Sequence, residues 1–406
     1  MQLQDYSAPF AVHPSSGGHA MSIRKSRSLP GMTSVELLDR NGEVVGVVAA
    51  FLRHLAARDY SPNTLIAYAH DLQHLWEFFS STGSAWDEFT PRRSIEFLEY
   101  LRAVTATNRV QRLMPALAIA QQGLPALRLA ATTINRILSA VSSFYEFAIM
   151  AEQYHRDNPI QKSVDRMAQR VPDRHRPFMD GASRQQPMRR RVSVKTVQRL
   201  PRPLSDDQVT ALFEALRSRR DRALLGLMLD GGLRPGEALG LHVEDVSYGR
   251  RRVAIRPRND HPKGVRSKSR YERFVDLCET ETLSSVNDYV MSERPVDAVT
   301  PFLFVVGGSG AHRLEPLGYP ALAKLFARAC TRAGIRVAWL TPHSLRHTHA
   351  TRMWEAGMRE LTLQRRLGHA SPESTRMYTR ISDSAVVEDY CRALGIGKHD
   401  ATDAQP

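Results

Sequence analysis

Apolar residues recur at helical spacing along the first part of the chain. Residues 44–55 place them at i, i+3, i+4, i+7, i+8 and i+11, which is one face of a helix. Residues 61–79 and 90–101 carry further stripes, and each begins with a hydroxyl residue followed by proline, a helix start signal. A fourth stripe covers residues 132–150. These stripes predict a compact all-α domain over residues 42–160.

Two segments lack such stripes. Residues 1–41 combine proline, serine and glycine, and we expect this N-terminal segment to be disordered. Residues 161–203 carry twelve Lys or Arg against three Asp, which predicts a basic linker. The linker can be a solvated tether without a partner, but we expect it to lie along a phosphate backbone. The DNA-binding residues expected within it are Arg189, Arg190, Arg191 and Lys195.

A second domain is predicted to begin near Ser205, which starts a helix with a capping box. An apolar helix over residues 222–230 follows and ends at two glycines. Residues 252–256 and 272–277 then alternate polar and apolar side chains, as strands of a half-exposed sheet do. Helical patterns occupy most of the remaining chain. We therefore expect a mainly α domain with a small antiparallel β-sheet over residues 204–396.

Composition and net charge predict what the protein binds and where in the cell it acts. Hydrophobic residues make up 42% of the chain, and no apolar run reaches the roughly 18 residues of a membrane span. Without a signal pattern or a cysteine pair motif, we expect a cytoplasmic, nucleoid-associated protein that makes no membrane contact. The formal net charge of +14 favours polyanions such as nucleic acid, although charge can also simply keep a protein soluble. Residues 397–406 are expected to form a tail.

The most informative stretch runs from residue 341 to residue 347. His343 and Arg346 are three residues apart, so both project from one face of a predicted first helical turn. The pair of His343 and His347 could suggest zinc, but Ser344 stands where a zincin requires glutamate. The positive end of this helix and the arginine suit an anion better than a metal. We therefore expect no metal site.

Three further groups could carry chemistry, although each alone has an ordinary explanation. Arg234 follows two glycines and could grip a phosphate, or form a surface salt bridge with Glu237. A basic loop between the two predicted strands contains Lys268 and could probe a nucleic-acid groove, or merely be solvated. His369 and Tyr378 could be a structural histidine and a packed phenol.

The order and spacing of these groups together resemble those of the tyrosine recombinase (phage integrase) family. That family presents G-L-R-x-G-E, a hairpin lysine, H-x-L-R-H, L-G-H and a tyrosine nine residues later. The hairpin lysine normally precedes an R-x-V-P-L strand by five residues, which selects Lys268 over Lys263, although Asp276 replaces the proline. The matching segments are Gly232-Leu233-Arg234-Pro235-Gly236-Glu237, Lys268, His343-Ser344-Leu345-Arg346-His347, Leu367-Gly368-His369 and Tyr378.

The resemblance implies a fold and a mechanism. The first domain would be the SAM-like core-binding domain and the second the catalytic domain, as in large recombinases of mobile elements, integrases or transposases. Tyr378 would attack a DNA phosphodiester and form a 3′-phosphotyrosine, without metal or cofactor. The implied helpers are Arg234 and Arg346 as a phosphate clamp, His369 as a hydrogen-bond donor, His343 as the proton acceptor, Lys268 as the acid, and Glu237 behind Arg234.

The resemblance also implies partners and leaves alternatives open. Double-stranded DNA is the expected substrate, with a homotetramer on DNA, and a partner recombinase or accessory proteins could set direction. A terminal helix around residues 384–394 could dock on a neighbouring protomer or on its own domain. The alternatives are an Xer-like resolvase, a topoisomerase IB-like enzyme, a non-catalytic DNA-binding regulator and a metal-dependent hydrolase.

Overall fold

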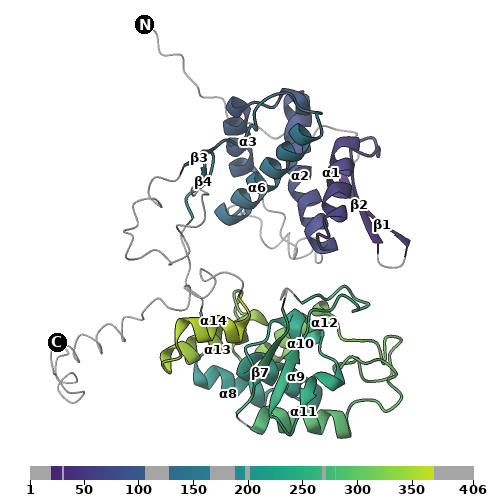
Figure 1. Ribbon diagram of the computed structural model, residues 1–406, viewed down its shortest axis with the longest axis vertical. Coiled ribbons are helices and arrows are strands. Elements are labelled where there is room, and N and C mark those ends of the chain that lie inside the picture. Colours follow the sequence, from purple (N-terminus) through teal and green to yellow (C-terminus); the bar gives the residue numbers. More distant parts are fainter. Residues whose placement is uncertain are drawn as a thin grey trace, which may run out of the picture. The chain divides into compact units, whose positions relative to one another are not determined.

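The computed structural model describes residues 20–29, 32–105, 128–164, 188–196, 202–267, 271–278 and 280–369. The chain divides into two compact units, Met1–Val197 and Gln198–Pro406 (Figure 1). The mainly helical character and the small antiparallel sheets agree with the expected fold class. Among the described helices, none combines the length and the apolar character needed to cross a membrane.

The first unit is built around four helices that match the predicted stripes. Ser61 and Thr90 accept the hydrogen bonds that cap the second and third helices, each with proline at its first position. Phe144 contacts the rings of Phe51 and Trp76 edge to face, so aromatic rings pack against one another within the core. The helices are α1 (Gly46–Ala57), α2 (Pro62–Thr82), α3 (Pro91–Ala103) and α6 (Ala131–Met150), with the short 3₁₀ helix η1 (Trp86–Glu88).

The N-terminal segment contains a β-hairpin, so the expectation of disorder over residues 1–41 is wrong for this part. Strands β1 (Ser22–Leu29) and β2 (Met32–Leu38) pair antiparallel and pack against α1 and α2. Val35 and Leu37 are buried because they alternate on the inner face, a period of two that a search for helical stripes misses. Residues 1–19 lie outside the described part.

Two segments of the predicted linker fold onto the first unit. Strands β3 (Lys162–Val164) and β4 (Met188–Arg190) pair antiparallel. The side chain of Asn135 on α6 then binds both the backbone N–H and the backbone carbonyl of Val194, each at 2.9 Å. The expectation of a linker without regular structure over residues 161–203 is therefore wrong for residues 162–164 and 188–196, since their backbone pairs within the first unit. Residues 165–187 and 197–201 are not described.

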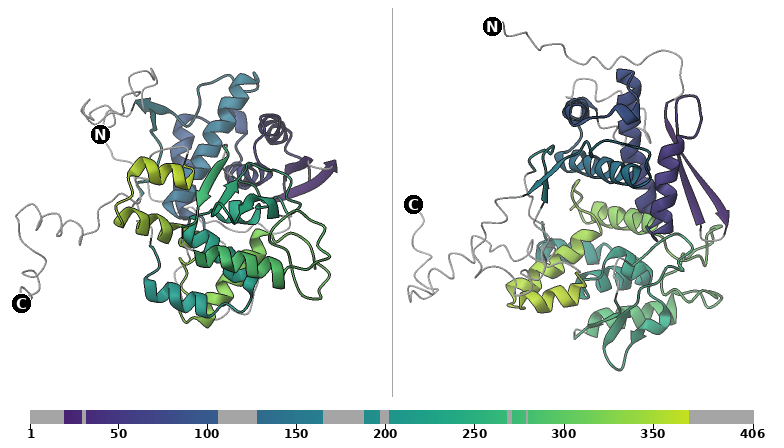
Figure 2. Two further views of the ribbon diagram at one scale, coloured as in Figure 1. Left: turned by 60° about the horizontal axis from the view of Figure 1, so that its bottom comes forward. Right: turned by 45° about the horizontal axis from the view of Figure 1, so that its top comes forward.

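The second unit packs helices against a three-stranded sheet. Its central helix, α9 (Arg219–Asp230), contacts α10 (Pro235–Leu239), α11 (Thr280–Ser292) and α13 (His343–Glu355). The yellow-green pair α13 and α14 (Glu360–Leu367) lies side by side in both views of Figure 2. The elements are α8 (Asp206–Glu214), α9 (Arg219–Asp230), α10 (Pro235–Leu239), η4 (Val243–Asp245), β5 (Val246–Ser247), β6 (Arg252–Ile255), β7 (Arg273–Asp276), α11 (Thr280–Ser292), α12 (Tyr319–Arg332), α13 (His343–Glu355) and α14 (Glu360–Leu367).

The two predicted strands are present as β6 and β7, and the short strand β5, which was not predicted, extends the sheet to the order β5-β6-β7, antiparallel throughout. Val253 faces Val275 across the two longer strands, and both are buried, whereas Phe274 is 54% exposed. The predicted capping box of Ser205 and Gln208 is present at the start of α8. On β7, Val275 is buried while Phe274 and Asp276 are exposed, as the alternating sequence predicts, whereas residues 253–255 of the middle strand β6 are all buried. The outer boundaries of the predicted domains remain predictions.

Candidate active site

The site is built around Glu237, whose side chain is completely buried. Helix α9 ends before two glycines, and Gly232 adopts a positive φ of 61° that turns the chain into α10. Arg234 stands just before α10. The Glu237 carboxylate accepts hydrogen bonds from the backbone N–H of Arg234 at 2.9 Å and from Nη1 of Arg234 at 2.7 Å. Because the Glu237 side chain is buried, this pair is not an ordinary surface salt bridge.

Two more arginines reach the same carboxylate from distant parts of the chain. Arg273, the first residue of β7, donates from Nη2 at 2.7 Å and from Nη1 at 3.0 Å. Nη1 of Arg346, on α13, lies 3.7 Å from Oε2 of Glu237. Burial alone would raise the pKa of Glu237, but the hydrogen bonds and charges of Arg273, Arg346 and Arg234 lower it below its ordinary value. The carboxylate is therefore ionised among three cations.

The turn after α14 joins this cluster through its backbone. The carbonyl of Leu367 accepts from Nη2 of Arg346 at 2.7 Å and from Nη1 of Arg234 at 3.2 Å. The carbonyl of Gly368 accepts from Nη2 of Arg234 at 3.1 Å. Nη1 of Arg346 also donates to Gly232 at 2.7 Å, so this arginine crosslinks two turns. The three motifs named from the sequence thus meet at one place.

His369 follows this turn and is close to both clamp arginines. Burial, reinforced by the charges of Arg346 and Arg234, lowers its pKa to about 3. The imidazole is therefore neutral near pH 7, a form in which one ring nitrogen carries a proton that it can donate. His343, the first residue of α13, is exposed. The structure thus brings Arg234, Glu237, Arg346 and His369 together, with His343 at the open end of the helix that carries Arg346.

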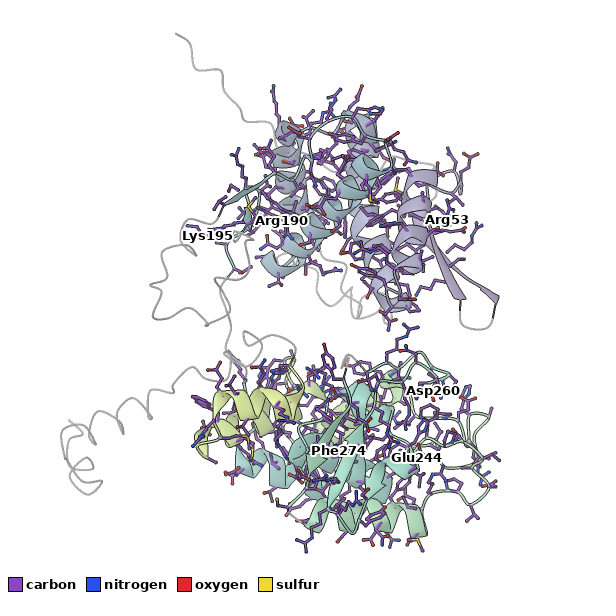
Figure 3. All side chains as sticks on the ribbon, in the orientation of Figure 1. Arg53, Arg190, Lys195, Glu244, Asp260 and Phe274 are labelled. Atoms are coloured by element: carbon purple, nitrogen blue, oxygen red, sulfur yellow. The ribbon has the colours of Figure 1, made fainter. Side chains whose placement is uncertain are left out.

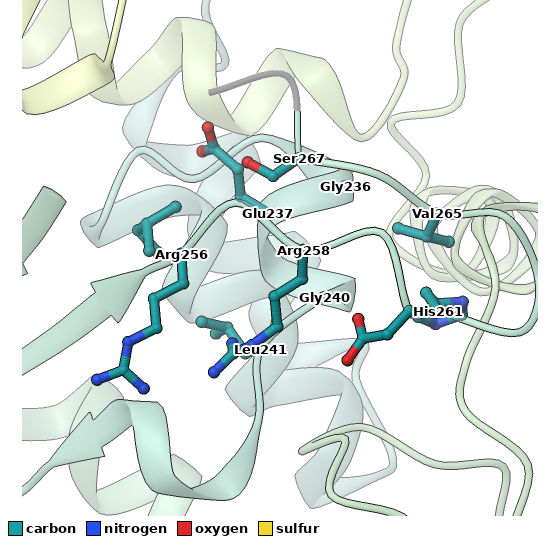
Figure 4. Close-up of a pocket in the computed structure, with 11 residues that line it drawn as sticks. Gly236, Glu237, Gly240, Leu241, Arg256, Arg258, His261, Val265 and Ser267 are labelled. Atoms are coloured by element: carbon teal, nitrogen blue, oxygen red, sulfur yellow. The ribbon is translucent and has the colours of Figure 1, made fainter. Parts of the chain in front are cut away.

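Lys268 and Tyr378 lie outside the described residues. The chain that leads to residue 268 is packed against α10, because a Cβ on Gly236 would lie 2.6 Å from the carbonyl oxygen of Arg266. Ser267 and Glu237 line one small pocket there (Figure 4). Lys263, the alternative hairpin lysine, is engaged elsewhere, with its Nζ 2.9 Å from Glu315.

The predicted DNA-binding residues belong to the first unit. Arg189 and Arg190 lie on β4, and Figure 3 labels Arg190 and Lys195 on this unit. Arg189, Arg191 and Lys195 are exposed, whereas Arg190 is half-buried and its Nη1 lies 3.4 Å from the carbonyl of Asn135. Three of the four are therefore open to solvent, as a phosphate contact requires.

Sequence reasoning missed two members of the site. Arg273 was noted only as one charge of a basic hairpin and as the first residue of the strand match that selects Lys268, without a role in the site, and Arg366 was not noted. Alternation along β7 could have placed Arg273 on the same face as buried Val275. Arg366 donates from Nε to Nε2 of His349 at 3.0 Å, a contact that no local sequence pattern predicts.

Within the described ranges, no group of three His, Cys, Asp or Glu could hold a metal ion.

Comparison with known proteins gives two family matches and relatives along most of the chain. The Phage integrase family matches residues 202–385, and the phage integrase N-terminal SAM-like domain matches residues 48–152. Transposase A from transposon Tn554 of Staphylococcus aureus is 28% identical over 364 residues, covering 89% of this chain and 95% of that protein. Tyrosine recombinase XerC of Roseiflexus sp. (strain RS-1) is 27% identical over 350 residues, covering 83% and 90%.

Solved structures share the fold at low sequence identity. The integrase of transposon Tn1549, in complex with transposon right end DNA, aligns with a TM-score of 0.58 at 18% identity, over 86% of this chain and 98% of that chain. The XerH recombinase bound to palindromic difH aligns with a TM-score of 0.54 at 17% identity, over 83% and 82%. The two family matches and the full-length relatives together show that the chain belongs to the phage integrase family and is a tyrosine-type site-specific recombinase.

Proposed function

We propose that this recombinase cleaves and rejoins double-stranded DNA of a mobile element through a 3′-phosphotyrosine on Tyr378. The relative named a transposase aligns along 95% of its own length, and the solved neighbours include recombinases in complex with DNA. These relationships support DNA as the partner and a transposase or integrase as the type of enzyme. The formal net charge of +14 suits a polyanionic substrate.

The convergence of Arg234 and Arg346 beside His369 is the observation that carries the proposal. Three guanidiniums, counting Arg273, surround the single carboxylate of Glu237, so the site keeps an excess of positive charge. A pentacoordinate phosphate gains negative charge on its non-bridging oxygens in the transition state, and fixed cations stabilise that charge. In this proposal Arg234 and Arg346 hold those oxygens, His369 donates a hydrogen bond, and Glu237 orients Arg234.

The nucleophile and the acid complete the step. The Oη–P bond of Tyr378 forms while the bond from phosphorus to the 5′ oxygen breaks. His343 accepts the phenol proton, and Lys268 donates a proton to the departing 5′ oxygen. The phosphodiester energy is kept in the phosphotyrosine link, so a 5′-hydroxyl can reverse the step and reseal the strand without a cofactor.

The remaining expectations extend this proposal to the assembly. Arg189, Arg190, Arg191 and Lys195 would contact phosphates next to the cleavage site and make DNA binding salt-sensitive. Four protomers would assemble on two DNA sites, with a partner recombinase or accessory proteins setting direction. The protein would act in the cytoplasm on the nucleoid. The domain of residues 42–160 would bind DNA, and the domain of residues 204–396 would carry out strand cleavage.

The nucleophile can be tested by covalent capture. The protein is incubated with a randomised library of nicked duplexes, and DNA that stays attached after denaturation is sequenced and resynthesised as one substrate. Tyr378→Phe should bind this duplex as well as the parent does and trap none of it, because only the phenol oxygen can form the bond. Tyr319→Phe, a change at a partly exposed tyrosine of the same unit, is the matched control. An adduct that persists in Tyr378→Phe would remove this residue from the role.

A further inference from the structure

Arg273 has an unusual set of partners for a residue at the base of a basic hairpin. Its side chain is 10% exposed, and its fork grips both oxygens of the Glu237 carboxylate. Its Nε donates to the carbonyl of Arg366 at 3.1 Å, in the last turn of α14. One side chain therefore joins the segment of Arg234 and Glu237 to the segment that leads into His369.

The glycine of the L-G-H motif makes room for this arginine. Gly368 adopts a φ of 63°, and a Cβ placed on it would lie 2.8 Å from Nη1 of Arg273 and 2.9 Å from its Cζ. Both the backbone conformation and the close approach therefore require glycine here. The guanidinium of Arg273 packs directly against the turn whose carbonyls also accept from Arg234 and Arg346.

We propose that Arg273 is a positioning residue for strand cleavage, which fixes the guanidiniums of Arg234 and Arg346 by holding Glu237 and the turn at residues 366–368. The inference rests on the proposed function, because it assumes that these two arginines clamp the scissile phosphate. Arg273 acts through them and through Glu237, since its own fork is bound to the carboxylate.

Electrostatics explains why a third arginine helps. A buried carboxylate is stable only when opposite charges and hydrogen bonds compensate its desolvation. If Arg273 were absent, Glu237 would rely on Arg234 and Arg346 alone, and their guanidiniums would be drawn toward it. Arg273, on strand β7, donates two hydrogen bonds to the Glu237 carboxylate and compensates its charge. Positive charge on the two clamp arginines is then left for a phosphate.

Geometry gives the second reason. Arg234 and Arg346 both donate to the carbonyl of Leu367, so any shift of this turn moves both guanidiniums. Nε of Arg273 holds the neighbouring carbonyl in place. Misplacement of a catalytic group by about 1 Å can lower a rate on the order of 100-fold. Loss of Arg273 should therefore affect chemistry much more than DNA affinity.

The test is a double-mutant cycle on the rate of covalent adduct formation. The full-length protein, at saturating concentration, is mixed with the captured nicked duplex, and the single-turnover rate is measured for the parent, Arg273→Met, Arg346→Lys and the double variant. Arg273→Met should slow adduct formation on the order of 100-fold, as loss of positioned charge stabilisation does. In the Arg346→Lys background the same change should cost less than about tenfold, because an already disordered clamp has little left to lose.

Arg252→Met is the matched control, since Arg252 lies on the adjacent strand and pairs with exposed Asp276. It removes the same charge from the same sheet and should leave the rate within about twofold, as exposed ion pairs contribute little. Arg273→Lys keeps the charge without the fork, so its rate should fall between those of the parent and Arg273→Met.

Several outcomes would overturn the inference. They are an unchanged rate in Arg273→Met, or equal losses in both backgrounds while DNA affinity and the unfolding midpoint stay at parent values. If Arg273→Met fails to fold, the cycle is run with Arg273→Lys, and failure of both to fold would assign Arg273 to stability alone. A parent protein that forms no adduct would instead refute the proposed function, so the two failures are distinguishable.

Discussion

The two units of the chain each bury a carboxylate, but in opposite ways. Asp71 in the first unit has one arginine partner, Arg136, whose side chain is 52% exposed, and burial raises the pKa of Asp71 to about 6. Glu237 in the second unit is surrounded by three arginines, and its pKa is lowered although its side chain is completely buried. The Asp71–Arg136 pair is an ordinary structural ion pair. The three arginines around Glu237 instead keep its carboxylate ionised, although burying this charge costs desolvation free energy.

The cores of the two units also differ in the kinds of side chain that they bury. Ring contacts fill the first unit, where Phe144 and Tyr145 are among the fully buried side chains. Among the described residues, the buried polar and charged side chains number three in the first unit and nine in the second. Because burying polar groups disfavours folding unless they are paired, their concentration marks the unit that carries chemistry. An aromatic core provides a rigid scaffold without such chemistry.

The largest expected effect is on cleavage by Arg346→Ala. This change should slow adduct formation on the order of 1000-fold, since arginines that stabilise transferring phosphoryl groups carry large transition-state energies. Arg136→Ala, the corresponding change beside Asp71, should alter the rate less than about threefold, because Arg136 is half exposed and has no part in the proposed phosphate clamp. Single-turnover kinetics on one duplex compares the two directly. Similar losses from both changes would abolish the distinction between the units.

Stability gives a second comparison. Phe144→Ala should lower the free energy of unfolding of the first unit by about 4 kcal/mol, because it leaves a cavity among aromatic rings. Glu237→Gln should lower that of the second unit by about 3 kcal/mol, because it leaves buried guanidiniums without their counter-charge. Hydrogen exchange followed by mass spectrometry reads each unit separately. A Glu237→Gln variant as stable as the parent would show that the cluster does not depend on that charge.

The pH dependence of stability should differ in sign between the units. His349 is buried beside Arg366, and these effects lower its pKa to about 3, so the unfolded chain binds more protons than the native one between about pH 3 and 6.5. The second unit should therefore lose on the order of 2 kcal/mol from this group as pH falls from 7 to 5. Asp71, with its raised pKa, binds its proton more tightly when folded, so the first unit should gain about 1 kcal/mol over the same interval.

Two variants test these contributions. His349→Phe should reduce the acid loss of the second unit by the share of this residue, on the order of 2 kcal/mol, while His347 and His369, whose pKa values are also lowered, still contribute. Asp71→Asn should remove the gain of the first unit. Hydrogen exchange at pH 5 and pH 7 reads both units in one experiment. Parallel loss of stability in the two units, unaffected by either variant, would contradict the opposing assignments.

Sequence patterns predicted the helices better than the strands near the N-terminus. The four helices that the described residues of the first unit form follow from apolar stripes that persist over several turns. The hairpin of β1 and β2 was missed because only a few alternating residues, such as Val35 and Leu37, mark its inner face. Short strands gain their stability from pairing and packing with distant residues, which local periodicity does not contain.

The site was predicted in part for a similar reason. The motif order identified Arg234, Arg346 and His369, and the structure brings them together. Arg273 and Arg366 were not recognised as members because their roles depend on strand register and on contacts between β7 and α14, far apart in the chain. A motif identifies groups that chemistry needs, but the groups that hold them in place are found only in three dimensions.

The central claim is that the polar cluster around Glu237 serves a covalent attack by Tyr378 on DNA. The most direct measurement is peptide mapping of the trapped adduct by mass spectrometry, combined with analysis of both ends of the cut strand. The account predicts a nucleotide linked through its 3′-phosphate to the peptide that contains Tyr378, together with a free 5′-hydroxyl. Attachment at another residue, or through a 5′-phosphate, would contradict it.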